Sequence, residues 1–254
     1  MPELEFLGTG DAGQVPRWGC DCGACQRARL DPARKRRPCS AALHTEEGTT
    51  LIDAGCTDLA ERFAFDDIRR VLLTHFHMDH VQGLFHLRWG QCRSKIPVYR
   101  PDDPKGADDL YRHPGVFEFQ PPCPAFERQQ FPGFNLTPLP LLHSRPTQGL
   151  LIETPRTRLA WLTDTLGLPR VTQDFLQQQP RLDWLVLDCS EPPRQTPPRN
   201  HNDLTRALHT HHLLTPGRTL LTHIGHEFDD WLESDRGDLP ATVSIARDGL
   251  RISL

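Results

Sequence analysis

A run of metal-ligand side chains directly after a short apolar stretch limits the folds open to this chain. Residues 71–74 have the length and composition of a buried strand, and His75, His77, Asp79 and His80 follow within six positions. Three imidazoles and a carboxylate this close together at a strand end place four potential metal ligands around one point. The H-x-H-x-D-H spacing lets two of the histidines reach one ion while Asp79 and His80 turn towards a second, so it predicts half of a two-metal site.

The same arrangement, an apolar strand that ends in a ligand residue, recurs three times further along the chain. His143, Asp164 and His223 each follow such a strand. A lone histidine after a strand is more often a hydrogen-bonded loop residue, and a polar loop with incidental histidines is the alternative at each position. Together, however, these residues complete a site for two divalent ions. A carboxylate that bridges the pair holds such ions about 3.5–4 Å apart, and Asp164 is the candidate for this bridge.

Short apolar runs bounded by Gly, Pro, Asp and Asn alternate with helical patterns along the chain. This order predicts one mixed α/β domain, residues 1–254, in which helices pack on sheets. Asp248-Gly249 has the composition of a hairpin turn, and we expect the Pro- and Arg-rich segments 31–38 and 191–199 to be surface loops. The expected strands are 4–7, 50–52, 71–74, 97–99, 135–141, 150–153, 158–163, 182–187, 219–222 and the pair around residue 248, and the expected helices are 56–63, 80–87, 172–179 and 202–213.

Composition excludes several classes of protein. The 254 residues carry 29 basic and 33 acidic side chains, a net charge of −4, whereas a protein that binds a long polyanion needs a basic footprint. The longest apolar runs fall far short of the ~20 residues of a membrane span, and the N-terminus lacks the pattern of a secretory signal. We therefore expect a cytoplasmic protein that binds no membrane and no long nucleic acid, and whose eight cysteines are reduced or bind metal.

A second cluster of metal ligands lies near the N-terminus. Three thiols, those of Cys20, Cys22 and Cys25, stand within six residues, and flanking glycines allow the backbone to turn around an ion. These thiols can supply three of the four ligands of a tetrahedral zinc site. His226 is the best candidate for the fourth, because it lies three residues after one of the predicted strand-end ligands. Three reduced surface thiols are the alternative, but they would be a redox hazard, so we expect a structural zinc ion around residues 18–26. We expect the isolated cysteines to be small buried hydrophobic residues: Cys39, Cys56, Cys92, Cys123 and Cys189.

On these residues the sequence resembles the metallo-β-lactamase superfamily. The resemblance extends over essentially the whole chain, from a Gly8-Thr9-Gly10 loop and the segment 51–55, LIDAG, to the strand-end ligands. It implies an αββα sandwich, in which two packed mixed sheets are flanked by helices and the site lies at the strand ends. In that family, Asp53 would brace the metal loop by hydrogen bonds. The implied ligand sets are His75, His77 and His143 for one ion and Asp79, His80 and His223 for the other, with Asp164 between them.

More selective features resemble one subgroup of that superfamily. The segments 18–25, WGCDCGAC, and 74–83, THFHMDHVQG, are similar to the cyclic phosphate phosphodiesterases of the carbon–phosphorus lyase pathway of phosphonate catabolism. This resemblance implies hydrolysis of 5-phospho-α-D-ribosyl 1,2-cyclic phosphate to α-D-ribosyl 1,5-bisphosphate, and of nucleoside 2′,3′-cyclic phosphates. It also implies manganese at the active pair, a separate zinc and a homodimer. Zinc and iron are alternatives to manganese, because His and Asp ligands suit all three.

Hydrolysis of a cyclic phosphodiester needs a nucleophile, neutralisation of charge on the phosphoryl oxygens and a proton for the departing sugar oxygen. Two metal ions would supply the first two. We expect His201 to supply the proton, because it lies between a Pro-rich loop and a helix and reaches over the site without following a strand. A surface histidine at a helix N-terminus is the alternative. We expect Asp79 to orient the attacking water in addition to binding metal.

The arginine-rich run within residues 27–37 has two explanations. It fits a solvated surface better than a recognition patch for a 5-phosphate or a dimer partner, because charge runs usually lie on the surface.

Other functions share parts of the metal-ligand pattern. A tRNA 3′-end processing endonuclease has the same ligands, but nothing in this sequence looks like the long basic arm with which that family grips tRNA. A non-catalytic metal-bound accessory protein, similar to the pyrroloquinoline quinone biosynthesis protein, shares the Cys-rich segment. A metal site that no longer catalyses a reaction should have lost ligands, however, and all seven ligand residues are present here. A thioester or lactam hydrolase is a further option, which substrate assays would separate from a phosphodiesterase.

Overall fold

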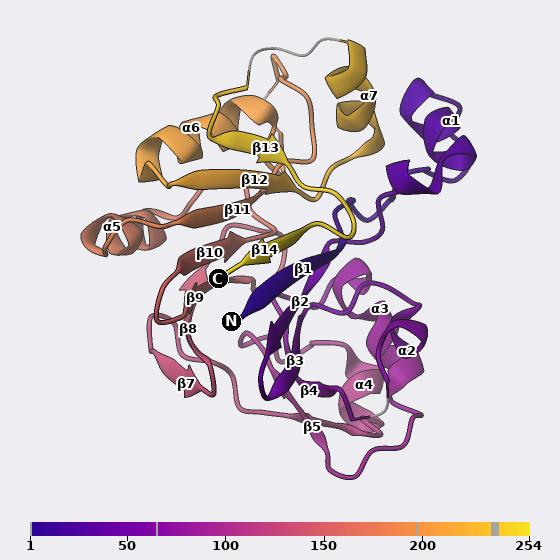
Figure 1. The fold of residues 1–254 in the computed structure, drawn as a ribbon, viewed down its shortest axis with the longest axis vertical. Helices are drawn as coiled ribbons and strands as arrows, with labels where there is room; N and C mark the ends of the chain where they lie inside the picture. Colours follow the sequence, from indigo (N-terminus) through magenta and orange to yellow (C-terminus); the bar gives the residue numbers. More distant parts are fainter. Residues whose placement is uncertain (1, 65, 197, 235–238) are drawn as a thin grey trace.

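The computed structural model describes residues 2–64, 66–196, 198–234 and 239–254. Within these residues, two mixed sheets of seven strands each face one another and helices cover their outer sides, which confirms the predicted αββα sandwich (Figure 1). The first sheet contains, in spatial order, β14 (Arg251–Ser253), β1 (Glu3–Gly8), β2 (Ser40–Thr45), β3 (Gly48–Ile52), β4 (Ile68–Leu72), β5 (Ile96–Tyr99) and β6 (Phe117–Phe119). The second contains β13 (Val243–Ile245), β12 (Arg218–Thr222), β11 (Trp184–Asp188), β10 (Arg158–Leu162), β9 (Gln148–Glu153), β8 (Phe134–Pro140) and β7 (Gln129–Phe131).

Most of the helices lie on the outer side of one sheet or the other. Near the first sheet are α2 (Leu59–Arg62), α3 (Met78–Leu87) and α4 (Asp108–Arg112), and near the second are α5 (Arg170–Gln178), α6 (Leu204–Leu214) and α7 (His226–Ser234), while α1 (Gly23–Leu30) lies beside α7. Although they belong to opposite ends of the chain, α1 and α7 pack against each other. None of the helices in the described part of the chain combines the length and the apolar character that crossing a bilayer requires.

The core between the sheets follows from the alternation of side chains along the strands. In β1, Leu4 and Phe6 are fully buried while the glutamates beside them are only partly covered, as expected when one face of a strand points inward. The ring of Phe6 lies 5.5 Å from that of Trp161, which comes from β10 of the opposite sheet. The Trp161 indole N–H donates to Thr163 Oγ1 at 2.9 Å, so this large side chain is buried without losing its hydrogen bond.

The carboxyl ends of several strands meet at one edge of the sandwich. β10, β11 and β12 are parallel neighbours, and β3, β4 and β5 are parallel neighbours in the other sheet. Strands that run in the same direction end at the same edge, so the residues that follow β4, β10 and β12 are brought together there. This edge is where the sequence places the predicted metal ligands.

The structure corrects two expectations about the turns and helices. Asp248-Gly249 does form a turn, but not a hairpin: β13 before it belongs to the second sheet and β14 after it belongs to the first, so the turn passes between sheets. The helix expected over 56–63 is only the short α2. The sequence reasoning also missed the strands β2, β6 and β7 and the helices α1, α4 and α7.

The arginine-rich run is not simply a solvated face. Arg36 is 3% exposed, and its guanidinium contacts Asp229 of α7 at 2.7 Å and the carbonyl of Ala246 at 2.8 Å. Arg27 and Arg34 pair with Asp230 and Glu233 of the same helix. Sequence reasoning missed these pairs because the acidic partners lie about 200 positions away in the chain. The run therefore joins the N-terminal segment to α7, and the surface-loop prediction for residues 31–38 is wrong at Arg36.

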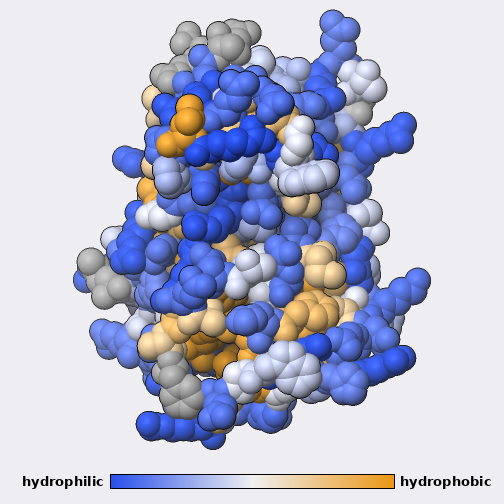
Figure 2. Space-filling model, turned by 90° about the vertical axis from the view of Figure 1, so that its right-hand side faces the viewer, coloured by the Kyte–Doolittle hydropathy of each residue, from blue (hydrophilic) through white to orange (hydrophobic). Residues whose placement is uncertain are grey.

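The side of the molecule that carries α1, α2 and α3 is mostly hydrophilic in its upper part, while apolar side chains gather in a hollow in its lower part (Figure 2). This lower half contains the first sheet with α2 and α3 (Figure 1). Under these helices, Leu59, Val81 and Leu84 are buried against Leu51 and Val71 of the sheet.

We predict that Gly83→Ala destabilises the fold, although alanine is ordinarily the better helix former. Gly83 lies inside α3, and a Cβ there would overlap the carbonyl oxygens of Cys56 and Ala54, the latter at 2.7 Å. Because both obstacles are backbone atoms, we expect a loss of about 1–3 kcal/mol in the free energy of unfolding, measured by chemical denaturation. His86→Ala, on the exposed side of the same helix, should be nearly neutral. A Gly83→Ala variant as stable as the parent would contradict this packing.

Candidate metal centre

Seven predicted ligands converge where the strands end. His75 and His77 follow β4, Asp79 and His80 stand in the first turn of α3, and the others follow β8, β10 and β12. Their ligand atoms form two groups, each with all atoms within 4.8 Å of one another, and Asp164 belongs to both. The groups are His75, His77, His143 and Asp164, and Asp79, His80, Asp164 and His223.

The first group is tightly spaced. His77 Nδ1 lies 2.9 Å from His75 Nε2 and 3.0 Å from His143 Nε2. Asp164 Oδ2 is 3.6 Å from His75 Nε2 and 3.7 Å from His143 Nε2. Atoms that share an ion at about 2.0–2.2 Å lie roughly 3–3.5 Å apart, so the spacing matches a coordination shell.

The second group has a similar geometry around the other side of Asp164. Asp164 Oδ2 is 3.2 Å from His80 Nε2 and 3.4 Å from His223 Nε2. Asp79 Oδ2 lies 3.3 Å and 3.6 Å from the same two nitrogens. Asp164 is thus the residue that lies between both groups, as the sequence predicts for a bridging carboxylate.

Unpaired polar atoms show that these residues fit divalent cations. In the described part of the chain, His80 Nε2, His223 Nε2 and Asp164 Oδ1 are buried and have no hydrogen-bond partner. Buried polar atoms are normally paired, and these three belong to residues of the second group. A bound cation would satisfy them, because imidazole nitrogen and carboxylate oxygen are the ligands that zinc, manganese and iron accept.

Hydrogen bonds fix the orientation of the ligand histidines through their other ring nitrogens. Thr74 Oγ1 contacts His75 Nδ1 at 3.0 Å, Ser190 Oγ contacts His223 Nδ1 at 2.9 Å, and the carbonyl of Asn200 accepts from His143 Nδ1 at 3.2 Å. Such partners hold a metal-ligating imidazole in the correct tautomer.

Asp53 supports the metal loop as the family resemblance implies. It is fully buried, and its carboxylate accepts from the Thr74 N–H at 2.8 Å, from Thr74 Oγ1 at 2.7 Å and from His80 Nδ1 at 2.7 Å. Its backbone has a φ of 57°, in a region that non-glycine residues rarely occupy. The interactions of its carboxylate keep it there, since an unusual backbone persists only where its surroundings hold it.

The electrostatics separate the histidines into two kinds. Burial lowers the pKa of His75 and brings that of His77 to about 4, so both have a lone pair available for a metal at neutral pH. Burial opposes protonation of His223 as well, but Asp164 and Asp79 outweigh it and raise the pKa of His223 to about 10. The buried carboxylates therefore favour positive charge in the group that contains His223, and either protons or divalent cations can supply that charge.

His201 lies beside this centre without belonging to either group. Its Nδ1 contacts Asp188 Oδ2 at 2.8 Å, and its ring lies 4.7 Å from that of His223 and 5.1 Å from that of His143. Burial alone would lower the pKa of His201, but the charge and hydrogen bond of Asp188 raise it. Asp188 also accepts from the Thr165 N–H at 2.9 Å, next to the bridging carboxylate.

Sequence reasoning missed Asp188 and Ser190. Asp188 is the last residue of β11, so it follows the same strand-end pattern that revealed the metal ligands. The expected strand stops one residue earlier, at Leu187, so Asp188 is not recognised as a ligand-type residue at a strand end. Ser190 has no signal of its own, because an isolated serine after a strand is ordinary.

A polar pocket of about 250 Å³ opens onto the centre. Its volume lies just below the range of typical small-molecule sites, roughly 300–1,000 Å³. The pocket therefore fits a small polar substrate. It is lined by Asp11, Ala12, Arg17, His77, Asp79, His143, Asp164, Ser190, Glu191, Arg194, Asn200, His201, His223, Gly225, His226 and Glu227.

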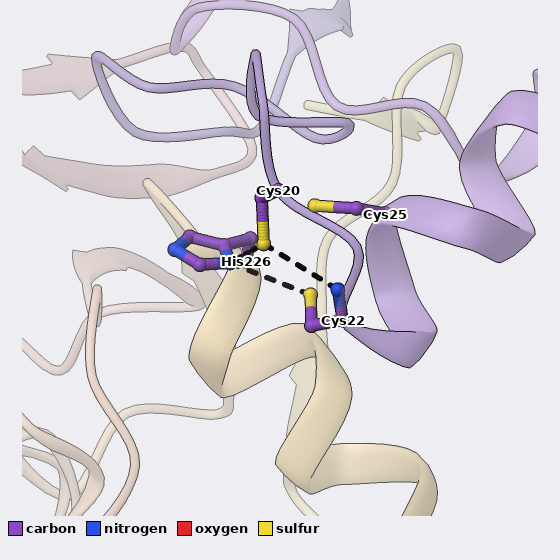
Figure 3. A group of neighbouring side chains, drawn as sticks. All are labelled: Cys20, Cys22, Cys25 and His226. Atoms are coloured by element: carbon purple, nitrogen blue, oxygen red, sulfur yellow. Dashed lines mark hydrogen bonds between the residues drawn. The ribbon is translucent and has the colours of Figure 1, made fainter.

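The structure also brings together the four residues of the predicted zinc site. His226 stands at the start of α7 and points towards the thiols of the loop before α1 (Figure 3). Its Nδ1 lies 3.4 Å from Cys20 Sγ and 3.4 Å from Cys22 Sγ, and all four ligand atoms lie within 4.8 Å of one another. This is the ligand set of a closed tetrahedral zinc site.

The isolated cysteines divide into two kinds. Cys39, Cys56, Cys123 and Cys189 are buried, as predicted, whereas the prediction is wrong for Cys92, which is partly exposed in the loop after α3.

Comparison with known proteins identifies the family. A family model described as a β-lactamase superfamily domain matches residues 49–224, and the chain belongs to the metallo-β-lactamase superfamily. Among curated relatives, coenzyme PQQ synthesis protein B of Methylobacterium radiotolerans is 28% identical over 216 residues, which are 72% of this chain and 71% of that protein.

Solved structures agree on the fold. A diphosphatase from the PhnP family has a TM-score of 0.81 and 26% identity, and the match covers 99% of this chain and 96% of that one. Zn²⁺-bound PqqB from Methylobacterium extorquens has a TM-score of 0.77 at 20% identity, with 99% and 100% of the chains covered. The short form of human tRNase Z has a TM-score of 0.70 at 18% identity, covering 99% and 98%. Two of these three neighbours, the diphosphatase and the tRNase Z, have names of hydrolases, and the fold is shared with them.

We predict that Cys22→Ser removes about one metal ion per chain and lowers the melting temperature, because a structural zinc ion contributes folding free energy. Metal content is measured by mass spectrometry of the purified protein and stability by calorimetry. Cys92→Ser changes a thiol outside the cluster and should alter neither. An unchanged metal content in Cys22→Ser would mean that the four residues hold no ion.

Proposed function

We propose that this protein is a metal-dependent phosphodiesterase that hydrolyses 5-phospho-α-D-ribosyl 1,2-cyclic phosphate, and also nucleoside 2′,3′-cyclic phosphates. The observation that carries the proposal is the placement of the His201–Asp188 pair beside the two ligand groups in one small pocket. Similarity to a diphosphatase of the PhnP family supports a phosphoryl substrate. Manganese at the active pair, the homodimer, the cytoplasmic location and the place in phosphonate catabolism stay predictions.

The two ligand groups would hold two divalent ions, which would supply Lewis-acid activation of the phosphoryl oxygens and of the attacking water. The chain's own residues orient the reactants. Asp79 lines the pocket, and despite its burial, the neighbouring imidazoles of His223 and His80, with Nε2 atoms 3.6 Å and 3.3 Å from its Oδ2, keep its pKa low. As a carboxylate it can therefore accept a hydrogen bond from the attacking water and orient it towards phosphorus.

His201 provides the proton that the departing sugar oxygen needs. Asp188 accepts from Nδ1 and stabilises the imidazolium, which leaves Nε2–H as the proton donor. As the water oxygen bonds to phosphorus, the water releases one proton to solvent, and as the bond from phosphorus to the ring-closing oxygen breaks, the Nε2 proton moves to that oxygen. A proton from solvent then restores the His201 imidazolium. The product is a phosphate monoester with a free hydroxyl group.

A tRNA 3′-end endonuclease is a weaker alternative. The likeness to human tRNase Z, at 18% identity, shows the fold only. The net charge of −4 and the small pocket are poorly suited to a long polyanion.

A role like that of coenzyme PQQ synthesis protein B is the second candidate, because the curated relatives carry that name. All seven predicted ligands converge in this chain, with the His201–Asp188 pair beside them. A purely accessory role gives no reason to keep this arrangement, so we favour catalysis.

We predict that the manganese-reconstituted protein hydrolyses bis(4-nitrophenyl) phosphate and ribosyl 1,2-cyclic phosphates, and that chelation abolishes both activities. The reason is that both ester substrates need the charge neutralisation that the buried ligand groups would provide through bound ions. Release of 4-nitrophenol is followed by absorbance and the sugar product by phosphorus NMR. Asp164→Asn, which changes the residue shared by both groups, is the inactive control.

Two outcomes would count against the phosphodiesterase. Cleavage of a thioester or a lactam, with both phosphodiesters untouched, would assign another hydrolase activity to the centre. Cleavage of a diphosphate ester alone would move the activity towards that of the PhnP-family diphosphatase.

We predict that His201→Ala slows hydrolysis of adenosine 2′,3′-cyclic phosphate about 10²–10⁴-fold, the usual contribution of a general acid. Hydrolysis of bis(4-nitrophenyl) phosphate should change far less, because 4-nitrophenolate leaves without a proton. Steady-state kcat on both substrates measures the difference. His209→Ala, an exposed histidine on α6, is the matched control. Equal losses on the two substrates would remove the general-acid role from His201.

A further inference from the structure

Arg17 connects the cysteine cluster to the pocket above the metal centre. It lies in the loop before the cluster and lines the pocket together with His201 and His223. Its backbone N–H donates to Cys25 Sγ at 3.2 Å, and its Nη1 lies 3.1 Å from His226 Nε2. One member of the cluster therefore holds the backbone of Arg17, and another lies beside its guanidinium.

Zinc binding would decide whether the contact between Arg17 and His226 can be a hydrogen bond, because it fixes which ring nitrogen of His226 carries the proton. His226 Nδ1 faces Cys20 and Cys22, so it is the nitrogen that would hold zinc. A neutral imidazole that binds metal through Nδ1 carries its proton on Nε2. Nε2–H and the guanidinium would then both be donors, and two donors cannot bond to each other. An anionic oxygen placed against both groups would satisfy them together.

The positive charge of Arg17 is available for such an anion. The other arginine of the pocket, Arg194, pairs with Glu191 at 2.5 Å and Glu227 at 2.7 Å. Among the described residues, no carboxylate oxygen lies within 4.0 Å of the Arg17 guanidinium. Asp11 also lines the pocket and interacts electrostatically with Arg17, but its Oδ1 accepts from the Gly13 N–H at 2.9 Å, and burial raises its pKa, which favours the neutral carboxyl group.

We propose that Arg17 and His226 Nε2–H form a subsite for a second phosphate group of the substrate, a phosphate monoester remote from the bond that is hydrolysed. The proposal rests on the proposed function, since it assumes that the reacting phosphodiester occupies the metal centre. A guanidinium offers two parallel N–H donors and matches phosphate oxygens, which favours a phosphate over a neutral group. The cysteine cluster then has a role in recognition in addition to stability, because it sets the position of both donors.

Equilibrium binding tests this subsite independently of catalysis. Metal-loaded protein is titrated calorimetrically with ribose 5-phosphate, and in parallel with ribose and with inorganic phosphate. We expect ribose 5-phosphate to bind, and Arg17→Gln to weaken its binding about 10- to 100-fold, the value of a charge-assisted hydrogen bond. Arg17→Lys should fall between the two. Arg34→Gln, which removes an arginine that pairs with Glu233, should bind like the parent.

Several results would overturn the proposal. They are the absence of binding to the parent protein, equal binding by parent and Arg17→Gln, and loss of zinc from Arg17→Gln, which would make the residue merely structural. Inorganic phosphate that binds as tightly and with the same dependence on Arg17 would assign the site to the free anion instead. Hydrolysis assays do not enter this measurement, so the subsite and the phosphodiesterase activity can fail separately.

Discussion

The burial of the Asp164 carboxylate is the constraint on which the rest of the site depends. Its Oδ2 has imidazole nitrogens of His75, His80, His143 and His223 within 3.2–3.7 Å, and these histidines follow strands of both sheets. A buried charge is tolerated only where opposite charge or hydrogen bonds compensate it. The two sheets must therefore pack so that their strand ends converge on this one carboxylate. Protons on the histidines, or bound cations, compensate the charge of Asp164. The groups that would bind metal at this edge of the sandwich therefore also contribute to its stability.

The cysteine cluster extends this dependence to the ends of the chain. His223 and His226 are three residues apart, so the loop after β12 contributes to the metal centre and to the cluster at once. Arg36, buried against Asp229 of α7, holds the helix that begins at His226 about one turn further along. The thiols, the imidazole and the ion pairs thus join the N-terminal segment to α7. The position of Arg17 in the wall of the pocket depends on these contacts.

Much of this arrangement could be predicted from sequence, because metal ligands that follow strands combine two independent signals. Apolar runs mark the strands, and parallel strands bring their carboxyl ends to one edge, so the sequence predicts that the seven ligands meet there. Their division into two sets is what the family resemblance implies. The remaining features lack such a signal. The pairing of Arg36 with Asp229 depends on contacts across about 190 positions, and the composition of the arginine-rich run gives no hint of it. The Asp248-Gly249 turn has the composition of a hairpin, yet the strands on its two sides belong to different sheets. Tertiary packing, not the composition of the turn, determines whether the flanking strands pair with each other.

The arrangement of hydrogen bonds explains why a separate histidine is needed for proton transfer. Each ligand histidine has one ring nitrogen directed at the centre and the other engaged by a neighbour, as Thr74 engages His75 and Ser190 engages His223. Such a histidine has no nitrogen left to give a proton to a leaving group. His201 differs because Asp188 occupies only Nδ1, and its ring also lines the pocket. Asp188 reaches the Thr165 N–H as well, so the strand that fixes the acid also fixes the loop of the shared carboxylate. The distance between the proton donor and the centre is thereby set by one side chain.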